Sequence, residues 1–110
     1  MSGPLTREVR VGRVGDIPEG EAAVVELNRR AAVFHVKGGE FLAIDDRCTH
    51  QEAYLSDGFV DDFTVECPLH ASCFDLRTGA PIGPPAVVPV RTWPVVVRGE
   101  EVFIIVEDDG

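Results

Sequence analysis

The sequence predicts an all-β fold, and three observations support this prediction. Short runs of β-branched and other apolar residues alternate with Gly, Pro, Asp and Asn along the chain, which is the pattern of strands separated by turns. Helical periodicity is not sustained over three turns anywhere in the sequence. The chain has 110 residues, 45% of them hydrophobic, so an ordinary core is expected. We therefore expect one domain over residues 1–110.

The first half of the chain is expected to form four strands. These strands are predicted at residues 6–14, 22–27, 31–36 and 41–45. A turn at Asn28-Arg29-Arg30 separates the second strand from the third. Lys37-Gly38-Gly39-Glu40 is expected to be a hairpin turn, because two glycines supply the positive φ angles that a tight turn needs.

The second half is expected to be less regular. Residues 46–58 show no strand pattern, and short strands are predicted at 63–66 and 73–76. A closing hairpin is predicted from strands 87–97 and 101–106 around Arg98-Gly99-Glu100. Pro94 lies within the first of these strands, which indicates an edge strand or a bulge, because proline has no amide hydrogen to donate.

The net charge of −9 argues against nucleic acids and anionic membranes as partners. Eight acidic residues and a single basic residue lie between positions 40 and 66. The eight are Glu40, Asp45, Asp46, Glu52, Asp57, Asp61, Asp62 and Glu66. We expect Asp45-Asp46 and Asp61-Asp62 to serve turns. The group as a whole either forms an acidic surface that steers a basic partner protein or serves solubility alone.

Targeting signals are not apparent in the sequence. Residues 1–7 lack the apolar segment of a secretory signal, and no apolar run reaches the length of a membrane span. The chain has three cysteines, an odd number that suits reduced thiols. These features lead us to expect a cytoplasmic protein.

Two short motifs contain four of the six Cys and His residues. Cys48-Thr49-His50 and Cys67-Pro68-Leu69-His70 are separated by sixteen residues, and each adjoins a predicted strand. A rigid β scaffold would therefore present two loops to one metal centre. The occupants compatible with two Cys and two His are a structural zinc ion, a mononuclear iron or copper ion and a 2Fe–2S cluster.

The mixed composition of each loop favours the cluster over zinc. Zinc fingers usually pair Cys with Cys and His with His, whereas here each loop supplies one Cys and one His. A binuclear cluster between two loops needs this arrangement, because each loop then reaches both irons. A structural zinc module without a redox role remains the alternative.

The motifs C-T-H and C-P-L-H, the latter followed by F-D-L-R-T-G, resemble a Rieske-type 2Fe–2S ferredoxin. The sequence is most similar to the ferredoxin components of multicomponent aromatic-ring dioxygenases, over roughly residues 16–106. The resemblance implies a Rieske-type fold of stacked small antiparallel sheets, in which two loops form a cluster-binding subdomain. These loops would span about residues 46–58 and 67–73, and a proline-rich loop at about 83–86 would cover the cluster.

The resemblance also implies the site residues and the partners. Cys48 and Cys67 would hold the inner iron of one 2Fe–2S cluster, and His50 and His70 the outer iron. The chain would be a monomeric electron carrier and not an enzyme by itself. It would take single electrons from a flavin-containing reductase and pass them to a terminal Rieske non-haem iron oxygenase in aromatic hydrocarbon catabolism. The alternative is a small Rieske-like subunit of an assimilatory nitrite reductase.

Respiratory Rieske proteins differ from this sequence at four positions. They carry an extra Cys in each loop, where this chain has Ala53 and Leu69, so the bracing disulfide of that class is excluded. They also carry a Ser and a Tyr that donate hydrogen bonds toward sulfur. Only the Ser is present here, as Ser72, because Phe74 occupies the Tyr position. We expect a low-potential centre whose potential is raised somewhat by Ser72.

Three other residues of chemical interest are expected to have structural roles. Cys73 is expected to be a small, buried or partly buried residue. His35 lies within a predicted strand and is expected at the surface or packed, and not as a ligand. Trp93, next to Pro94, is expected to serve packing or a partner contact.

Overall fold

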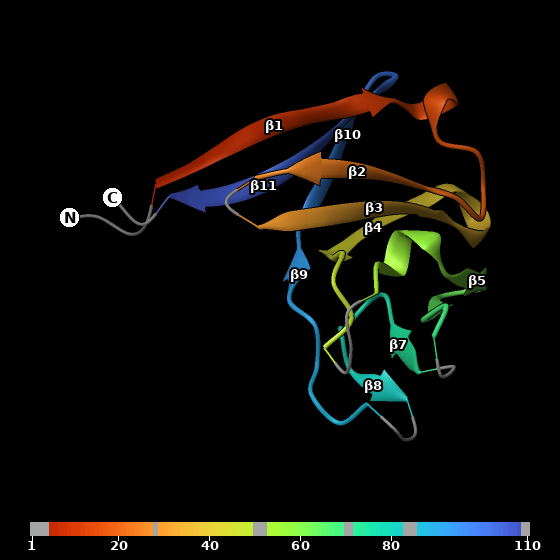
Figure 1. Cartoon of the computed structure of the whole chain (residues 1–110). Helices are drawn as coiled ribbons and strands as arrows, with labels where there is room; N and C mark the ends of the chain where they lie inside the picture. Colours follow the sequence, from red (N-terminus) through yellow and green to blue (C-terminus); the bar gives the residue numbers. More distant parts are fainter. Residues whose placement is uncertain (1–4, 28, 50–52, 70–71, 83–85, 109–110) are drawn as a thin grey trace.

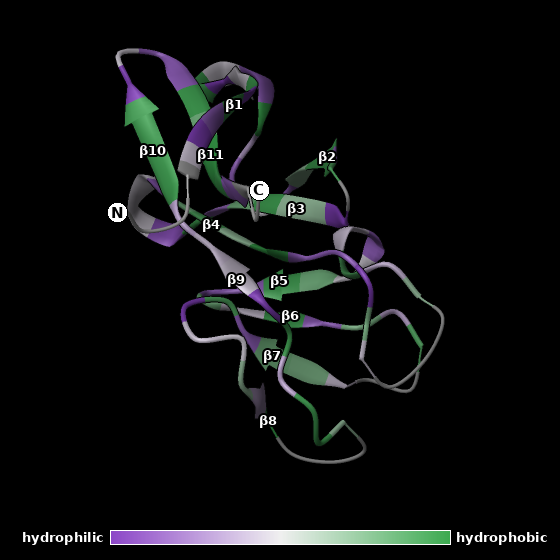
Figure 2. Cartoon of the chain, turned by 90° about the vertical axis from the view of Figure 1, so that its left-hand side faces the viewer, coloured by the Kyte–Doolittle hydropathy of each residue, from purple (hydrophilic) through white to green (hydrophobic). Residues whose placement is uncertain are grey.

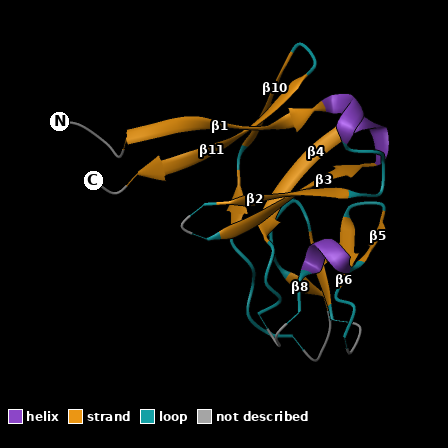
Figure 3. Cartoon of the chain, turned by 45° about the horizontal axis from the view of Figure 1, so that its top comes forward, coloured by secondary structure: helices purple, strands orange, loops and turns teal. Residues whose placement is uncertain are grey.

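The computed structural model describes residues 5–27, 29–49, 53–69, 72–82 and 86–108. Strands and loops dominate these ranges (Figure 3), and no α-helix is found in them. The helical elements of the described residues are the 3-10 turns η1 (Val14–Asp16), η2 (Lys37–Gly39) and η3 (Leu55–Asp57). The described chain therefore offers no helix long and apolar enough to cross a membrane. The all-β prediction is confirmed.

The strands form three small antiparallel sheets (Figure 1). The first sheet has the order β1 (Leu5–Arg13), β11 (Glu101–Asp108), β10 (Val95–Arg98). The second has the order β2 (Ala22–Glu26), β3 (Arg30–Val36), β4 (Glu40–Asp45), β9 (Thr92–Trp93). The third has the order β5 (Phe59–Asp61), β6 (Thr64–Glu66), β7 (Cys73–Asp75), β8 (Pro81–Ile82).

Strand β3 is buried on both faces because it lies between two cores. Ala31 and Val33 belong to a core shared with the first sheet. Ala32, Phe34 and Val36 belong to a core shared with the third sheet. Successive side chains of a strand point to opposite faces, so a strand covered on both sides requires a continuous apolar run. Figure 2 shows this apolar character along β3 and β4.

The core between the second and third sheets positions the candidate site. It contains Ile44 of β4 together with Val65 of β6 and Phe74 of β7, all fully buried. Cys48 and Cys67 belong to the same buried cluster. The loops that carry these cysteines are therefore anchored on the core that joins the two sheets.

The closing hairpin is shorter than the sequence predicted. Residues 86–91 are irregular, β9 pairs with β4 in the second sheet, and β10 pairs with β11 in the first. The chain changes sheet at Pro94, which cannot donate to either ladder. The prediction of a continuous strand over 87–97 is therefore wrong. The expectation of edge strands around Pro94 is confirmed, since β9 and β10 both lie at sheet edges.

The predicted turns agree with the backbone. Gly38 and Gly39 have φ angles of 84° and 83°. Asp62 has a φ of 52° in the tight turn between β5 and β6, where Asp and Asn tolerate the left-handed region better than other side chains. Strands β5 and β8 were not predicted, because they are only three and two residues long and too short to show a clear alternation.

Candidate metal centre

Cys48 and Cys67 lie in one apolar core although they come from different loops. Their side chains are 3% and 1% exposed, respectively, and both pack in the cluster that contains Leu55 and Phe74. Burying a thiolate in apolar surroundings is unfavourable unless a cation compensates its charge. The joint burial of two cysteines therefore suits a shared metal centre that both would ligate.

The two cysteine loops are closed by the same kind of backbone hydrogen bond. The amide of Cys48 donates to the carbonyl of Ala53 at 2.9 Å, and the amide of Cys67 donates to the carbonyl of Ser72 at 2.6 Å. In both loops the acceptor lies five residues after the cysteine. Each cysteine thus begins a short loop whose last residue returns beside it, which fixes the backbone from which the sulfur projects.

Gly58 allows the end of the first loop to approach the strand that leads into Cys67. A Cβ atom at this position would collide with the backbone carbonyl oxygen of Glu66, because the neighbouring Phe59 pairs with Glu66 across β5 and β6. Only glycine permits so close a backbone approach. The spacing between the two loops therefore depends on this residue.

The two predicted imidazole ligands, His50 and His70, lie outside the described residues, as do Glu52 and positions 83–85 of the predicted covering loop. The structure thus brings together the two predicted sulfur ligands. Within the described ranges there is no group of three or more Cys, His, Asp or Glu that could hold a metal ion. The complete ligand set stays a prediction.

The hydroxyl of Ser72 supports an iron–sulfur cluster at this place. Ser72 is fully buried, and its Oγ is the one buried side-chain polar atom among the described residues that has no hydrogen-bond partner. An unsatisfied buried hydroxyl costs about 1–3 kcal/mol. A cluster sulfide next to Cys67 would supply the acceptor, so the buried residues fit such a group. Phe74 is also fully buried and offers no second hydroxyl.

Asp45 and Asp46 are buried and do not serve turns as predicted. Asp45 is 6% exposed, lies at the end of β4, accepts a hydrogen bond of 3.0 Å from Nε1 of Trp93 and pairs with Arg29. Asp46 is fully buried. Neither carboxylate contributes to an acidic surface, which corrects the sequence prediction. Trp93 has a packing role, as one of the two predicted alternatives.

Cys73 and His35 also have environments that suit packing roles. Burial raises the pKa of the Cys73 thiol, and the negative charge of Glu66 raises it further. A raised pKa makes a thiol a weaker nucleophile and a weaker ligand. Nδ1 of His35 lies 2.6 Å from the carbonyl oxygen of Ile17, and its ring stacks on Phe41 at 4.4 Å.

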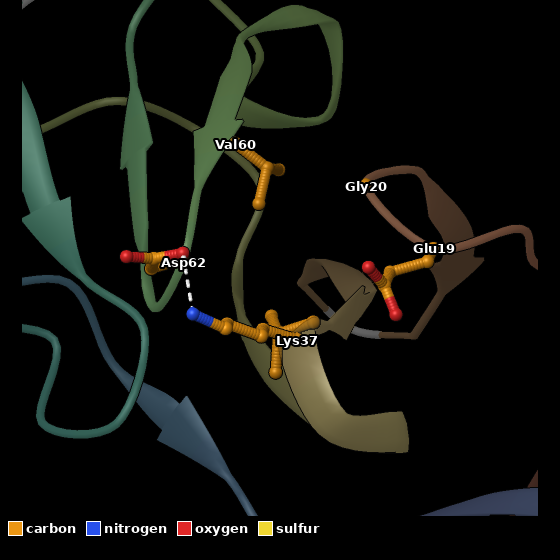
Figure 4. Close-up of a pocket in the computed structure, with 6 residues that line it drawn as sticks. Glu19, Gly20, Lys37, Val60 and Asp62 are labelled. Carbon is orange, nitrogen blue, oxygen red and sulfur yellow. Dashed lines mark ion pairs between the residues drawn. The ribbon is translucent and has the colours of Figure 1, made fainter.

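A surface pocket near the third sheet contains none of the predicted ligands. Figure 4 shows its lining residues, among them Glu19, Val60 and Asp62. Nζ of Lys37 lies 3.8 Å from Oδ1 of Asp62, so this exposed ion pair links the β5–β6 turn to η2. Exposed ion pairs of this kind contribute little stability. Because none of the predicted ligands lines the pocket, we assign it no part in the metal centre.

Comparison with known proteins identifies the class. Residues 7–94 match the family described as Rieske [2Fe-2S] domain. Because the match spans most of the chain, the chain belongs to the Rieske family and carries one Rieske-type 2Fe–2S cluster. The structural zinc alternative is thereby contradicted, since the domain of this family is described by its iron–sulfur cluster.

Similar proteins of known type are ferredoxins of dioxygenases. The chain is 51% identical over 92 residues to the 3-phenylpropionate/cinnamic acid dioxygenase ferredoxin subunit of Shigella boydii serotype 4 (strain Sb227), covering 83% of this chain and 86% of that protein. The ferredoxin of carbazole 1,9a-dioxygenase from Nocardioides aromaticivorans IC177 is 37% identical. Its structure aligns with a TM-score of 0.83 over 88% of this chain and 95% of that chain. The chain is therefore an electron-transfer ferredoxin, as predicted.

Two further structures bear on the predicted partners. A chain in the complex of reduced oxygenase and oxidized ferredoxin in carbazole 1,9a-dioxygenase is 34% identical, with a TM-score of 0.83 over 88% of this chain and 91% of that chain. A putative nitrite reductase NADPH small subunit is 26% identical, with a TM-score of 0.78 over 89% of this chain and 97% of that chain. The nitrite reductase alternative is thus the more distant one.

Proposed function

We propose that this chain carries single electrons from a flavin-containing reductase to a terminal Rieske non-haem iron oxygenase that acts on aromatic compounds. The observation that carries the proposal is the 51% identity to a dioxygenase ferredoxin subunit. The oxygenase partner is further supported by the related ferredoxin seen in complex with its oxygenase. Bond-making chemistry belongs to the oxygenase, and this chain supplies electrons.

We assign four ligands to the cluster. Cys48 and Cys67 hold the inner iron, while His50 and His70 hold the outer iron. The net charge of such a cluster is zero when it consists of two ferric ions, two sulfides, two thiolates and two neutral imidazoles. A cluster held by four cysteines carries two more negative charges. Adding an electron is therefore easier here, which is consistent with the higher potentials of histidine-ligated clusters.

The proposed organisation of the chain follows from the same assignment. Residues 1–110 act as one monomeric domain in the cytoplasm, with cluster-binding loops at about 46–58 and 67–73 and a covering loop at about 83–86. The continuous cores on both faces of β3 support one cooperative unit, because no described sheet packs independently of the second. A monomer suits a carrier that must dock with two partners in turn.

Exposed acidic residues and two arginines lie on different sides of the molecule. Among the exposed acids, Asp57 lies in η3, Asp61 at the end of β5 and Asp62 in the turn between β5 and β6. Arg29 and Arg30 lie at the start of β3, on the other side of the molecule from β5 (Figures 1 and 3). The acidic side would steer a basic partner surface toward the cluster.

Analysis of the purified protein and reconstitution of electron transfer test this proposal. Protein purified without oxygen should be red-brown and contain two irons and two acid-labile sulfides. Oxygenase turnover with a reductase should depend on adding the chain. Cys67→Ala should abolish the colour and the transfer, whereas the matched variant Cys73→Ala should keep both. A colourless protein, or a protein that transfers no electrons to any oxygenase and co-purifies with a large nitrite reductase subunit, would contradict the proposal.

A further inference from the structure

Asp46 places a buried carboxylate at the base of the first cysteine loop. Its side chain is fully buried and accepts three hydrogen bonds from two residues. Nε of Arg30 donates at 2.6 Å, the amide of Ser56 at 2.7 Å and the hydroxyl of Ser56 at 2.9 Å. Arg30 belongs to β3, whereas Ser56 lies in η3, near the far end of the first loop. One carboxylate therefore joins the scaffold to both ends of the loop.

The backbone of Asp46 also connects β3 with the far end of the first loop. Its amide donates to the carbonyl of Arg30 at 2.9 Å, and its carbonyl accepts from the amide of Leu55 at 2.5 Å. Inside this closure, Arg47 and Tyr54 form an antiparallel bridge, and Cys48 donates to Ala53. These contacts form a short antiparallel ladder that runs from Asp46 to Cys48. A shift of Asp46 would therefore move the cysteine.

Arg30 supplies the charge that balances the buried carboxylate. Its side chain is 34% exposed, and its guanidinium carbon lies 4.0 Å from the centroid of the Tyr54 ring. The hydrogen bond to Asp46 raises the pKa of Arg30. Without Arg30, the buried Asp46 carboxylate has lost its cationic partner. Without Asp46, Arg30 keeps only its pair with the exposed Glu26, at 3.2 Å. Low polarity near Cys48 strengthens the effect of either change.

We propose that Asp46 is a positioning residue for the first ligand loop, and that the Arg30–Asp46 pair helps to set the reduction potential of the cluster. This inference rests on the proposed ligand role of Cys48. Reduction adds negative charge to the cluster. A carboxylate at position 46 that has lost Arg30 therefore disfavours reduction. A guanidinium at position 30 that keeps only the exposed Glu26 as its partner favours it.

A neighbouring pair provides a matched control. Arg29 and Asp45 are also sixteen residues apart and also form an ion pair with a buried carboxylate. Asp45 precedes Asp46 by one residue and points to the opposite side, where it accepts from Trp93 in the core of the first and second sheets. Its removal should affect stability but should change the potential less than removal of Asp46.

The test measures the midpoint potential of purified, cluster-loaded protein for four variants of the Arg30–Asp46 pair and for one control, Asp45→Asn. Asp46→Asn should raise the potential, Arg30→Gln should lower it, and the double variant should return toward the wild-type value. Arg30→Lys keeps the charge and should stay closer to wild type than Arg30→Gln. Iron release to a chelator should be roughly tenfold or more faster in Asp46→Asn, because a buried charged hydrogen-bond network is lost. Asp45→Asn should show a smaller shift of the potential.

Opposite shifts for the two single variants would support the proposal, because purely structural damage has no reason to change sign between them. Unchanged potentials, or shifts in the same direction, would overturn it. If Asp46→Asn fails to keep its cluster, the midpoint potentials of the two Arg30 variants test the proposal instead. Ser56→Ala then tests the positioning role, through faster iron release. A wild-type protein without iron and sulfide would instead refute the proposed function, so the two failures are distinguishable.

Discussion

Thr49 Oγ1 donates a hydrogen bond of 2.6 Å to the carbonyl oxygen of Val88. Thr49 follows Cys48 in the first cysteine loop, whereas Val88 lies in the irregular segment 86–91 that leads to β9. This bond joins two parts of the chain that are 39 residues apart. It places the segment after the predicted covering loop directly against the first cysteine loop.

Replacing Thr49 by Val removes this hydrogen bond while the shape of the side chain is kept. We expect Thr49→Val to lower the free energy of unfolding by about 1 kcal/mol, the usual contribution of one hydrogen bond. Urea unfolding followed by the visible absorbance of the cluster measures the change. Thr49→Ser keeps the hydroxyl and is the control, and equal stability of the two variants would contradict the prediction.

Ser72 is expected to raise the reduction potential by donating to a cluster sulfide. Ser72→Ala should therefore lower the midpoint potential, on the order of 40 mV if the bond favours the reduced cluster by about 1 kcal/mol. Redox titration followed by electron paramagnetic resonance measures this shift. The neighbouring Cys73→Ala should leave the potential near the wild-type value. A Ser72→Ala potential equal to or above wild type would exclude this role.

Glu8 and Arg98 form an exposed ion pair between β1 and β10, on the first sheet. The hydrogen bond from Arg98 lowers the pKa of Glu8 below its ordinary value. Because folding lowers this pKa, the pair adds stability above the ordinary carboxyl pKa. That contribution is lost as the pH falls through the lowered value.

Arg98→Gln should move the titration of Glu8 back toward its ordinary range. Carbon-detected nuclear magnetic resonance of the side-chain carboxyl between pH 2 and pH 6 measures the change, with Arg77→Gln in the turn between β7 and β8 as control. The stability difference between wild type and Arg98→Gln should be present at pH 7 and should disappear in acid. A Glu8 titration unaffected by Arg98→Gln would rule out the pair as its cause.

The acidic side of the third sheet should accelerate docking with a basic partner. Asp61→Asn combined with Asp62→Asn removes two exposed charges, and Asn tolerates the positive φ of position 62. We expect a slower second-order rate of electron transfer at low salt, with the difference vanishing above about 0.5 M salt because screening shortens the range of charge. Stopped-flow mixing with reductase or oxygenase measures it. Glu107→Gln on the first sheet is the control, and a wild-type rate independent of salt would argue against steering.

Strand β3 was predictable because the pattern of its apolar residues is local. The apolar run of β3 needs no knowledge of its neighbours, and Gly38-Gly39 specifies its own turn. The change of sheet at Pro94 was not predictable, since it depends on β9 finding a place beside β4. A sequence shows that Pro94 breaks a ladder but does not show which strand pairs on each side.

The candidate site was predictable in its sulfur atoms and less so in its surroundings. Two Cys–His motifs identify Cys48 and Cys67 directly, and the structure buries both in one core. Asp46 was misassigned to a turn because a carboxylate before a loop usually caps or solvates it. Only the position of Arg30, sixteen residues earlier, reveals that this carboxylate is buried and paired.

The pairing of β1 with β11 brings the two ends of the described chain together. Leu5 lies opposite Asp108, at an end of the first sheet remote from the loops that carry the cysteines (Figure 1). An attachment at either end, to an electrode or through a linker to a redox enzyme, would thus lie away from the loops that carry Cys48 and Cys67. Tethering would also replace slow diffusional encounter by a millimolar local concentration. The fold is therefore suited to fusion or surface attachment in engineered electron-transfer chains.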